Sequence, residues 1–291
     1  IFVGLLGGWL VFLSEPPFDR ILLGSLPLLV AGLWEDLFKS ASSFVRFLAS
    51  IISGSLLVYL TRYYFTSLDI YIFDIVLTAF FLFPILTIIA VAALSNAINI
   101  IDGFNGLASG SVLLMALAIA YLGYQNDDIF VMKIALIFSA SVAGFFVVNF
   151  PRGLIFLGDA GAYLNGYILA GLAILLVERN DQITPFVLLV IFAYPIIELL
   201  FSIYRKTRRN KHRPDQPDKV HFHMLVYRSY ARKWSRTTLH QNSLTGLLML
   251  SFSALALFYV LFLPVTRAGA LLYFVIILFV YLYVYKRMSL N

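Results

Sequence analysis

The sequence contains no cysteine among its 291 residues, and only 12% of the residues are charged. The absence of cysteine excludes disulfide bonds and thiolate metal sites. So little charge falls well outside the composition of soluble globular proteins. Instead, 61% of the residues are hydrophobic and the mean hydropathy is +0.91. This composition indicates an integral membrane protein.

Ten apolar runs are candidates for membrane-spanning helices, which need about 20 apolar residues and somewhat fewer in a packed bundle. The runs cover approximately residues 1–13, 21–34, 47–64, 75–94, 108–123, 129–148, 163–177, 184–204, 244–263 and 270–285. The sequence thus predicts one transmembrane domain over residues 1–291, an all-α polytopic bundle of about ten helices. The chain begins inside an apolar run without Met, so we do not predict a signal peptide and expect further sequence before Ile1.

The basic residues are distributed unevenly between the loops on the two sides of these spans. One side carries 16 of the 21 Lys and Arg residues and the other carries 5, and a basic loop at 205–243 holds eleven of them. The positive-inside rule predicts that the richer side is cytoplasmic. Attraction to anionic lipid headgroups is an alternative role for the basic loop. The polar motifs described next all fall on the basic side.

The stretch SNAINIIDGFNGLASG, residues 95–110, lies between two apolar runs and is unusually polar. Asn96, Asn99 and Asp102 recur at i+3 spacing, so on a helix they share roughly one face. Gly103 allows backbone N–H groups to approach a ligand closely. Polar and acidic groups at a membrane helix are costly unless they have a function. The pattern favours a binding site over a polar clasp between helices, for which asparagine alone would suffice.

Asp159 lies in the string FLGDAGA, flanked by two glycines and followed by an apolar run. Asp at such a junction is a good helix N-cap. A helix N-terminus also suits phosphate, and one carboxylate there could hold Mg²⁺ together with substrate phosphates. The two interpretations are compatible. Phe156, just before, is either an anchor at the membrane surface or a stacking platform for a flat base.

Two further features are weaker signals. Glu35 and Asp36 end an apolar run, where Lys39 can partly neutralise them, and an ordinary solvated loop explains them equally well. Glu198 within an apolar run is a functional candidate by its position, although pairing with Arg205 would also explain it. We leave its role unassigned.

His221 and His223 lie in the basic loop, two residues apart. On an extended segment they share one side, whereas on a helix they point in nearly opposite directions. They could bind a transition metal, contact phosphate or donate protons, since histidine titrates near neutrality. The lack of cysteine and of a third close histidine weakens the metal interpretation, and a non-functional pair stays open.

Taken in order, these strings resemble the polyprenyl-phosphate N-acetylhexosamine-1-phosphate transferases, bacterial membrane enzymes that start cell-surface polysaccharides. EDLFK corresponds to the family's DDxxK, and NAINIIDGFNGLASG to NAxNxxDGxDGLAxG. Asn149 with FLGDAGA corresponds to NxxP…F(M/L)GDxGS, and PDKVHFH to the PDRxHxHH loop. Three positions depart from the pattern. Glu35 replaces the first Asp, Asn105 replaces the second Asp of DGxDG, and Met224 replaces the last His.

The resemblance implies transfer of an N-acetylhexosamine-1-phosphate from a UDP-N-acetylhexosamine to undecaprenyl phosphate, with release of UMP. We prefer direct attack, and a route through an enzyme-linked phosphosugar on Asp102 stays open. It implies a multi-pass protein in the lipid bilayer of the bacterial cytoplasmic (inner) membrane, with its site facing the cytoplasm and no nucleic-acid partner. The family is often dimeric, so a homodimer stays open. The competing hypotheses are a lipid-linked sugar transporter and a catalytically impaired scaffold. Polar groups gathered at one membrane surface argue against a transporter.

The resemblance also implies roles for individual residues. The metal would be Mg²⁺, with Mn²⁺ as an alternative, held by Asp159 with Asp102. The implied catalytic residues are Asp36, Asp102, His221 and His223. The implied substrate-binding residues are Glu35, Lys39, Arg46, Asn96, Asn99, Gly103, Asn105, Asn149 and Phe156.

Overall fold

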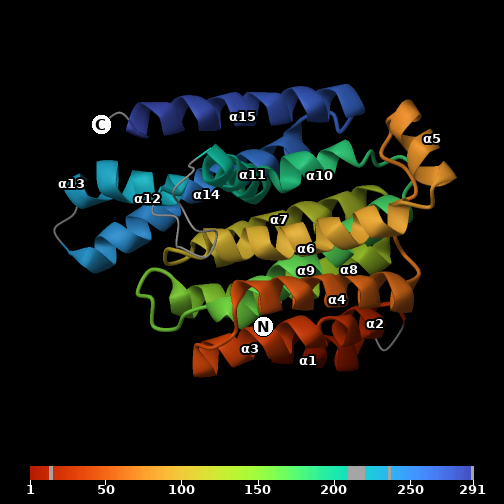
Figure 1. Cartoon of the computed structure of the whole chain (residues 1–291), viewed down its shortest axis with the longest axis horizontal. Coiled ribbons are helices and arrows are strands. Elements are labelled where there is room, and N and C mark those ends of the chain that lie inside the picture. The colour runs from red at the N-terminus through yellow and green to blue at the C-terminus, as the bar shows by residue number, and fades with distance from the viewer. Residues whose placement is uncertain (13–15, 209–219, 235–236, 290–291) are drawn as a thin grey trace.

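The computed structural model describes residues 1–12, 16–208, 220–234 and 237–289. These residues form helices and loops and contain no β-strand, which confirms the all-α prediction. Figure 1 shows most of the long helices lying along a common direction, as in a transmembrane bundle. The helices, with one π-helical turn named η1, are α1 (Phe2–Phe12), α2 (Phe18–Gly24), α3 (Leu26–Phe38), α4 (Ser43–Thr61), α5 (Tyr71–Ala79), α6 (Phe83–Ile101), α7 (Leu107–Gln125), α8 (Ile129–Asn149), α9 (Gly158–Glu178), α10 (Phe186–Ile191), α11 (Ala193–Arg208), α12 (Phe222–Val226), η1 (Tyr227–Ala231), α13 (Arg232–Trp234), α14 (Thr238–Phe262) and α15 (Arg267–Ser289).

Seven of the described helices are long and apolar enough to cross a membrane, or eight if the bent pair α2–α3 forms one span. The chain is therefore a polytopic membrane protein, but the predicted count of ten spans is not confirmed. The run at 184–204 is divided into α10 and α11, because Pro195 has no N–H to donate to Ile191. The first run forms only the short helix α1.

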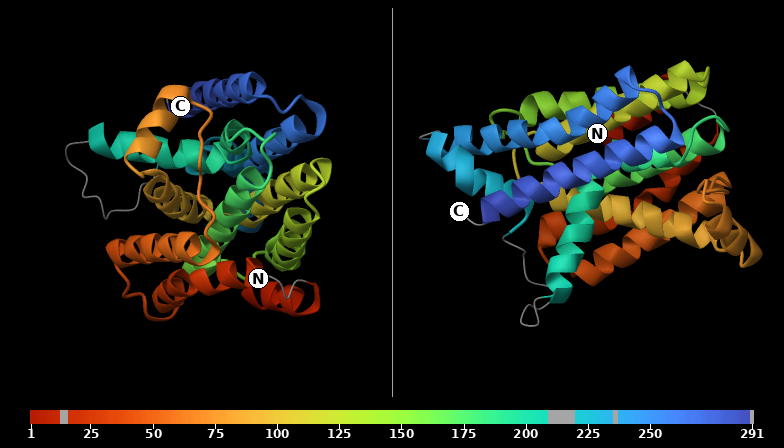
Figure 2. Two further views of the ribbon diagram at one scale, coloured as in Figure 1. Left: turned by 90° about the vertical axis from the view of Figure 1, so that its right-hand side faces the viewer. Right: turned by 90° about the horizontal axis from the view of Figure 1, so that it is seen from above.

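Helix α9 is the centre of the bundle, and 94% of its 18-residue apolar stretch is buried inside the protein. It packs against α3, α6 and α7, and the end-on view in Figure 2 shows it enclosed by other helices. Glycines permit this close packing. A Cβ on Gly166 would lie 2.5 Å from the Cα of Ser95 in α6, and a Cβ on Gly32 in α3 would overlap the backbone of Ala160. Small residues of this kind let membrane helices approach at backbone distance.

These two contacts determine which side chains reach the beginning of α9. Asp36 follows Gly32 by four residues, and Asn99 follows Ser95 by four residues. Residues four apart lie on the same face of a helix. Asp36 and Asn99 therefore both face the first turn of α9.

The loops that carry the predicted motifs lie at one end of the bundle. This end, which we call the motif end, comprises residues 39–42, 102–106, 150–157 and 220–234, and lies on the left in Figure 1. Residues 62–70 and 179–185 lie at the opposite end. The predicted loop at 205–243 is mostly helical where it is described, in α11, α12, η1, α13 and the beginning of α14. Residues 220, 221 and 237 are not helical, and residues 209–219 and 235–236 lie outside the described residues.

Candidate active site

Asp36 caps the N-terminus of α9 from the neighbouring helix α3. The N–H of Asp159 donates to its Oδ1 at 2.9 Å, and the N–H of Ala160 donates to its Oδ2 at 3.1 Å. A carboxylate is stabilised in this position by the positive end of the helix dipole. Gly158 turns the chain here with φ +68, and a Cβ on it would lie 2.6 Å from Asp36 Oδ2. The interpretation of Asp159 as the N-cap is wrong, because Leu157 is the N-cap and has no side-chain capping bond.

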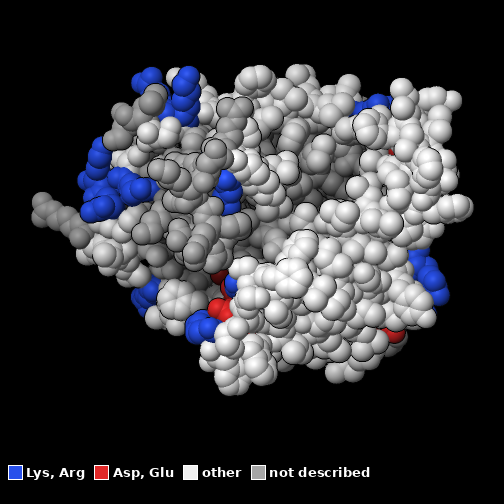
Figure 3. Space-filling model, in the orientation of Figure 1, with Lys and Arg blue, Asp and Glu red and all other residues white. Residues whose placement is uncertain are grey.

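Asp159 joins three helices through its carboxylate. Its Oδ2 forms an ion pair with Arg46 of α4, and its Oδ1 accepts a hydrogen bond from Asn99 Nδ2 of α6 at 3.0 Å. About a fifth of each side chain of the ion pair is exposed, 19% for Arg46 and 21% for Asp159. The group is therefore accessible from the motif end, where Figure 3 shows acidic atoms at the surface beside basic ones.

Asp102 ends α6 and carries a carboxylate that accepts no hydrogen bond from the residues that the structure describes. Its pKa is raised to about 7, first because burial disfavours the charged form and then because the charges of Asp159 and Asp36 repel it. The three aspartates thus lie close enough to influence one another. Asp102 is the member whose charge lacks a partner.

The donor set of this cluster can be compared with what a magnesium ion requires. No group of three or more His, Asp or Glu side chains in the described part of the chain is arranged to hold a metal. Mg²⁺ does not need such a cage, because it keeps several waters and takes one or two carboxylates together with substrate phosphates. The unpartnered Asp102 carboxylate, in a region of excess negative charge, fits that kind of site.

Asn96 lies one turn deeper in α6 than Asn99. Its Nδ2 donates to Ser50 Oγ of α4 at 3.3 Å and to the carbonyl of Ala92 at 2.8 Å. These contacts correspond to the polar clasp between helices that the sequence left as an alternative. A role for Asn96 in substrate binding stays a prediction.

Asn105 and Asn149 hold the loop at 150–157 against the turn at 102–106. Asn105 Nδ2 donates to the carbonyl of Pro151 at 3.1 Å. Asn149 Oδ1 accepts from the N–H of Gly106 at 2.6 Å, and its Nδ2 donates to the carbonyl of Ile155 at 2.7 Å. Both side chains are almost completely buried. Their observed partners are backbone groups, and their predicted contact with substrate is untested.

Asn105→Asp, which restores the family's usual residue, is expected to destabilise this protein. The carboxylate cannot donate to the Pro151 carbonyl and would be buried beside it, at a cost of about 1–3 kcal/mol. The melting temperature in detergent should fall. Asn105→Ala, which removes the donor without adding charge, should cost less. An Asn105→Asp protein as stable as the parent would contradict the structural role of the amide.

The histidine segment reaches the same turn. His221 is the N-cap residue of α12 and has an extended backbone. Its ring stacks on that of His223, with the ring centroids 5.4 Å apart and the ring planes inclined by 11°. The two histidine rings are thus adjacent, although only His221 is extended and His223 belongs to α12. A Cβ on Gly103 would lie 3.2 Å from His223 Nε2, so His223 contacts the turn that follows Asp102. The part of the PDKVHFH string at 217–219 lies outside the described residues.

The remaining predicted residues lie at the edge of the site. Glu35 Oε2 accepts from the N–H of Ala41 at 2.9 Å. Lys39 ends α3 in the left-handed conformation and is exposed, and Phe156 is 80% exposed on the 150–157 loop. Sequence reasoning missed Asn242, whose Oδ1 accepts from the N–H of Asn105 at 2.6 Å. No motif or unusual spacing marks this residue in the sequence.

Comparison with known proteins finds several relatives. A probable undecaprenyl-phosphate N-acetylglucosaminyl 1-phosphate transferase of Bacillus subtilis is 29% identical over 232 residues, which are 77% of this chain and 62% of that protein. A decaprenyl-phosphate N-acetylglucosaminephosphotransferase of Mycobacterium leprae is 31% identical over 48% of this chain and 40% of its own length. An undecaprenyl-phosphate alpha-N-acetylglucosaminyl 1-phosphate transferase of Thermotoga maritima is 27% identical over 92% of this chain and 81% of its own length.

The chain spans less than two thirds of the B. subtilis and M. leprae proteins that it matches. The model of the family named glycosyl transferase family 4 matches residues 20–177, which is more than half of this chain. This range contains Asp36, Asp102 and Asp159, the three carboxylates that meet at the motif end. The chain therefore belongs to glycosyl transferase family 4.

Proposed function

We propose that this protein transfers an N-acetylhexosamine-1-phosphate from a UDP-sugar to a polyprenyl phosphate and releases UMP. Membership of the family and the printed activities of its relatives support this reaction class. The single observation of this structure that supports it best is the cluster of Asp36, Asp102 and Asp159 beside the histidine segment. Phosphoryl transfer depends mainly on positioning and on neutralising charge. Such a cluster could hold the cation that neutralises the phosphates, and the histidines beside it could help to position them.

The bonds that change are those at the phosphorus attached to the sugar. An oxygen of the polyprenyl phosphate forms a bond to this phosphorus, and the bond from the phosphorus to the bridging oxygen of the UDP-sugar breaks. The electron pair of the broken bond leaves on the phosphate of UMP. The attack is direct, without a phosphosugar bound to the enzyme.

The described residues would contribute to this reaction in three ways. Asp102, with Asp159, would hold Mg²⁺, with Mn²⁺ as an alternative, and the ion would neutralise charge on the pyrophosphate of the donor. Arg46 and Asn99 hold Asp159 in place. Asp36 holds the first turn of α9, and with it the backbone of Asp159. His221 and His223 would bind the phosphates of the donor as hydrogen-bond donors.

The motif end would face the cytoplasm in the bacterial inner membrane. The excess of Lys and Arg on this side and the positive-inside rule support that orientation. A water-soluble nucleotide-sugar could then reach the site from solution while the acceptor arrives from the bilayer. We infer that the product is the first lipid-linked intermediate of a cell-surface polysaccharide.

A release assay tests the proposal. Purified full-length protein in detergent is mixed with undecaprenyl phosphate, Mg²⁺ and, in turn, several UDP-N-acetylhexosamines, and UMP is measured. We expect release with at least one donor, dependent on the acceptor and lost in EDTA. Absence of release with every donor, from protein that is folded by its thermal transition, would overturn the proposal in favour of a non-catalytic membrane protein.

A further inference from the structure

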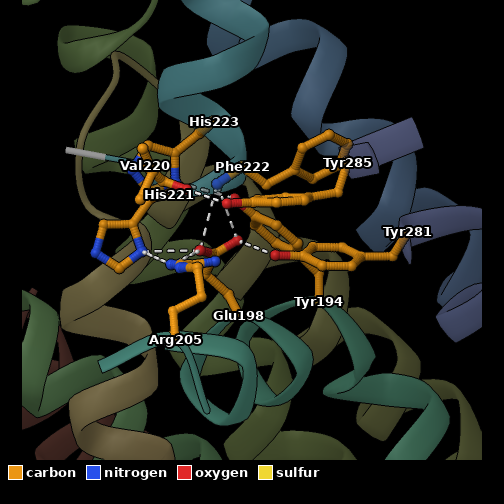
Figure 4. Close-up of polar contacts among 9 residues, drawn as sticks. All are labelled: Tyr194, Glu198, Arg205, Val220, His221, Phe222, His223, Tyr281 and Tyr285. Atoms are coloured by element: carbon orange, nitrogen blue, oxygen red, sulfur yellow. Dashed lines mark hydrogen bonds and ion pairs between the residues drawn. The ribbon is translucent and has the colours of Figure 1, made fainter. Parts of the chain in front are cut away.

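Glu198 is a buried carboxylate that the roles described above do not use. It lies in α11 with none of its surface exposed. Figure 4 shows that side chains from α11, α15 and the segment before α12 converge on it. A carboxylate in such surroundings is costly unless it is paired or hydrogen-bonded, and its partners indicate what it does.

The two oxygens of Glu198 bind the histidine segment on one side and α15 on the other. His221 Nδ1 lies 2.8 Å from Oε1, and the N–H of Phe222 lies 3.3 Å from both oxygens. The hydroxyl of Tyr281 donates to Oε2 at 2.7 Å. Arg205 lies 3.6 Å from Oε1, so the carboxylate also has the cationic neighbour that the sequence suggested.

The contact with His221 determines where the ring carries its proton. An ionised carboxylate only accepts hydrogen bonds, so the hydrogen of this contact must be on Nδ1. In the neutral ring Nε2 is then free to accept, and in the charged ring it donates. Nε2 is the ring atom that remains for a substrate, and because phosphate oxygens are acceptors, it is the charged ring that can donate to them.

A second contact from α11 orients the neighbouring ring. The hydroxyl of Tyr194 lies 3.3 Å from Nδ1 of His223, whose Nε2 faces Gly103. Both Nδ1 atoms therefore contact residues of α11, and the two rings are nearly parallel. On the far side, Tyr285, one turn after Tyr281, donates to the carbonyl of Val220 at 2.9 Å. The histidine segment is thus held between α11 and α15.

We propose that Glu198 is a positioning residue that acts through His221, holding the Nδ1–H of the ring against its own carboxylate, so that Nε2–H of the charged ring is left to donate to the phosphates of the donor. This inference depends on the proposed function for the role of His221 in turnover. The ring orientation itself is observed in the contact with Glu198 and does not depend on that function. In metal sites, removing a residue that orients a ligand from behind lowers metal affinity or activity by about 10–100-fold. We expect an effect of similar size here.

The main test compares Glu198→Gln with Glu198→Asp and with Glu178→Gln. Gln keeps the shape and loses the charge, so kcat should fall about 10–100-fold while KM for undecaprenyl phosphate stays within about threefold. Asp keeps the charge and should recover part of the loss. Glu178, which accepts hydrogen bonds from Thr66 at the opposite end of the bundle, is the matched control and should leave kcat unchanged. Parental kcat in Glu198→Gln would overturn the inference.

A double-mutant cycle distinguishes action through His221 from a general structural role. If Glu198 acts through this ring, Glu198→Gln should cause no further loss of kcat in a His221→Ala protein. Losses that simply multiply would overturn the inference. Should Glu198→Gln fail to fold, Tyr281→Phe removes one of the hydrogen bonds to Glu198 without altering His221 and is used in its place, with a smaller loss expected.

Nitrogen NMR of protein labelled at histidine tests the ring form independently of turnover. We expect the parent to show His221 with a protonated Nδ1, and Glu198→Gln to lose this preference. An unchanged tautomer would overturn the inference. Because the measurement needs no substrate, it remains decisive if no UDP-sugar yields UMP, an outcome that would refute the proposed function alone.

Discussion

Asp102→Asn is expected to lower kcat/KM by about 10³-fold or more while the protein stays folded. Asp102 is the one aspartate of the cluster whose carboxylate accepts no hydrogen bond from the described residues, so its charge is free for substrate and metal. Asn keeps the size of the side chain and removes only that charge. The measurement is UMP release under the conditions of the donor assay.

The stability of the same variant should change in the opposite direction. Burial and the neighbouring charges raise the pKa of Asp102 to about 7, so ionisation destabilises the folded state. The parent should therefore lose stability as the pH rises from the usual carboxyl range toward 7, whereas the amide side chain of the variant cannot ionise. At pH 8 in EDTA the melting temperature of Asp102→Asn should equal or exceed that of the parent.

Asp127→Asn provides the matched control. Asp127 is exposed at the opposite end of the bundle, in a left-handed conformation that Asn tolerates. It should change neither turnover nor stability. Turnover near the parental level in Asp102→Asn would exclude Asp102 from catalysis, and a clear fall in its melting temperature would show that the carboxylate has a structural partner.

Asp36→Ala is expected to reduce stability and turnover together. It leaves the N–H groups of Asp159 and Ala160 without their acceptor, which should cost about 1–2 kcal/mol by comparison with lost helix caps. Displacement of the first turn of α9 also moves Asp159, and an error of about 1 Å in such a group can cost about 100-fold in rate. Thermal unfolding and UMP release measure the two effects.

Two further variants check the cause of that result. Asp36→Asn keeps one acceptor oxygen and should lose less stability than Asp36→Ala. Gly158→Ala should resemble Asp36→Ala, because its Cβ would lie 2.6 Å from Asp36 Oδ2. If Asp36→Ala loses turnover with an unchanged melting temperature, the cap is unimportant, and Asp36 acts on the substrate as the family resemblance implies.

The amino-acid sequence by itself was enough to predict the class of the fold and the stretches that contain the site. Apolar runs of spanning length predict transmembrane helices because burying backbone in a bilayer requires internal hydrogen bonds. The polar strings around Asp36, Asp102, Asp159 and His221 stand out against that background. The number of spans was less predictable, since short runs and an internal proline such as Pro195 interrupt helices that composition alone treats as continuous.

Only the tertiary structure determined the partners of these residues. Asp36 and Asp159 are 123 residues apart in the chain, and local spacing does not reveal that one caps the helix of the other. That contact depends on Gly32, which lets α3 approach α9 at backbone distance, and Gly166 does the same for α6, which carries Asn99. The same holds for Glu198, whose hydrogen bond to His221 spans 23 residues between separate elements. The sequence alone shows which stretches carry polar and acidic side chains. Which of these side chains contact each other depends on how closely the helices pack.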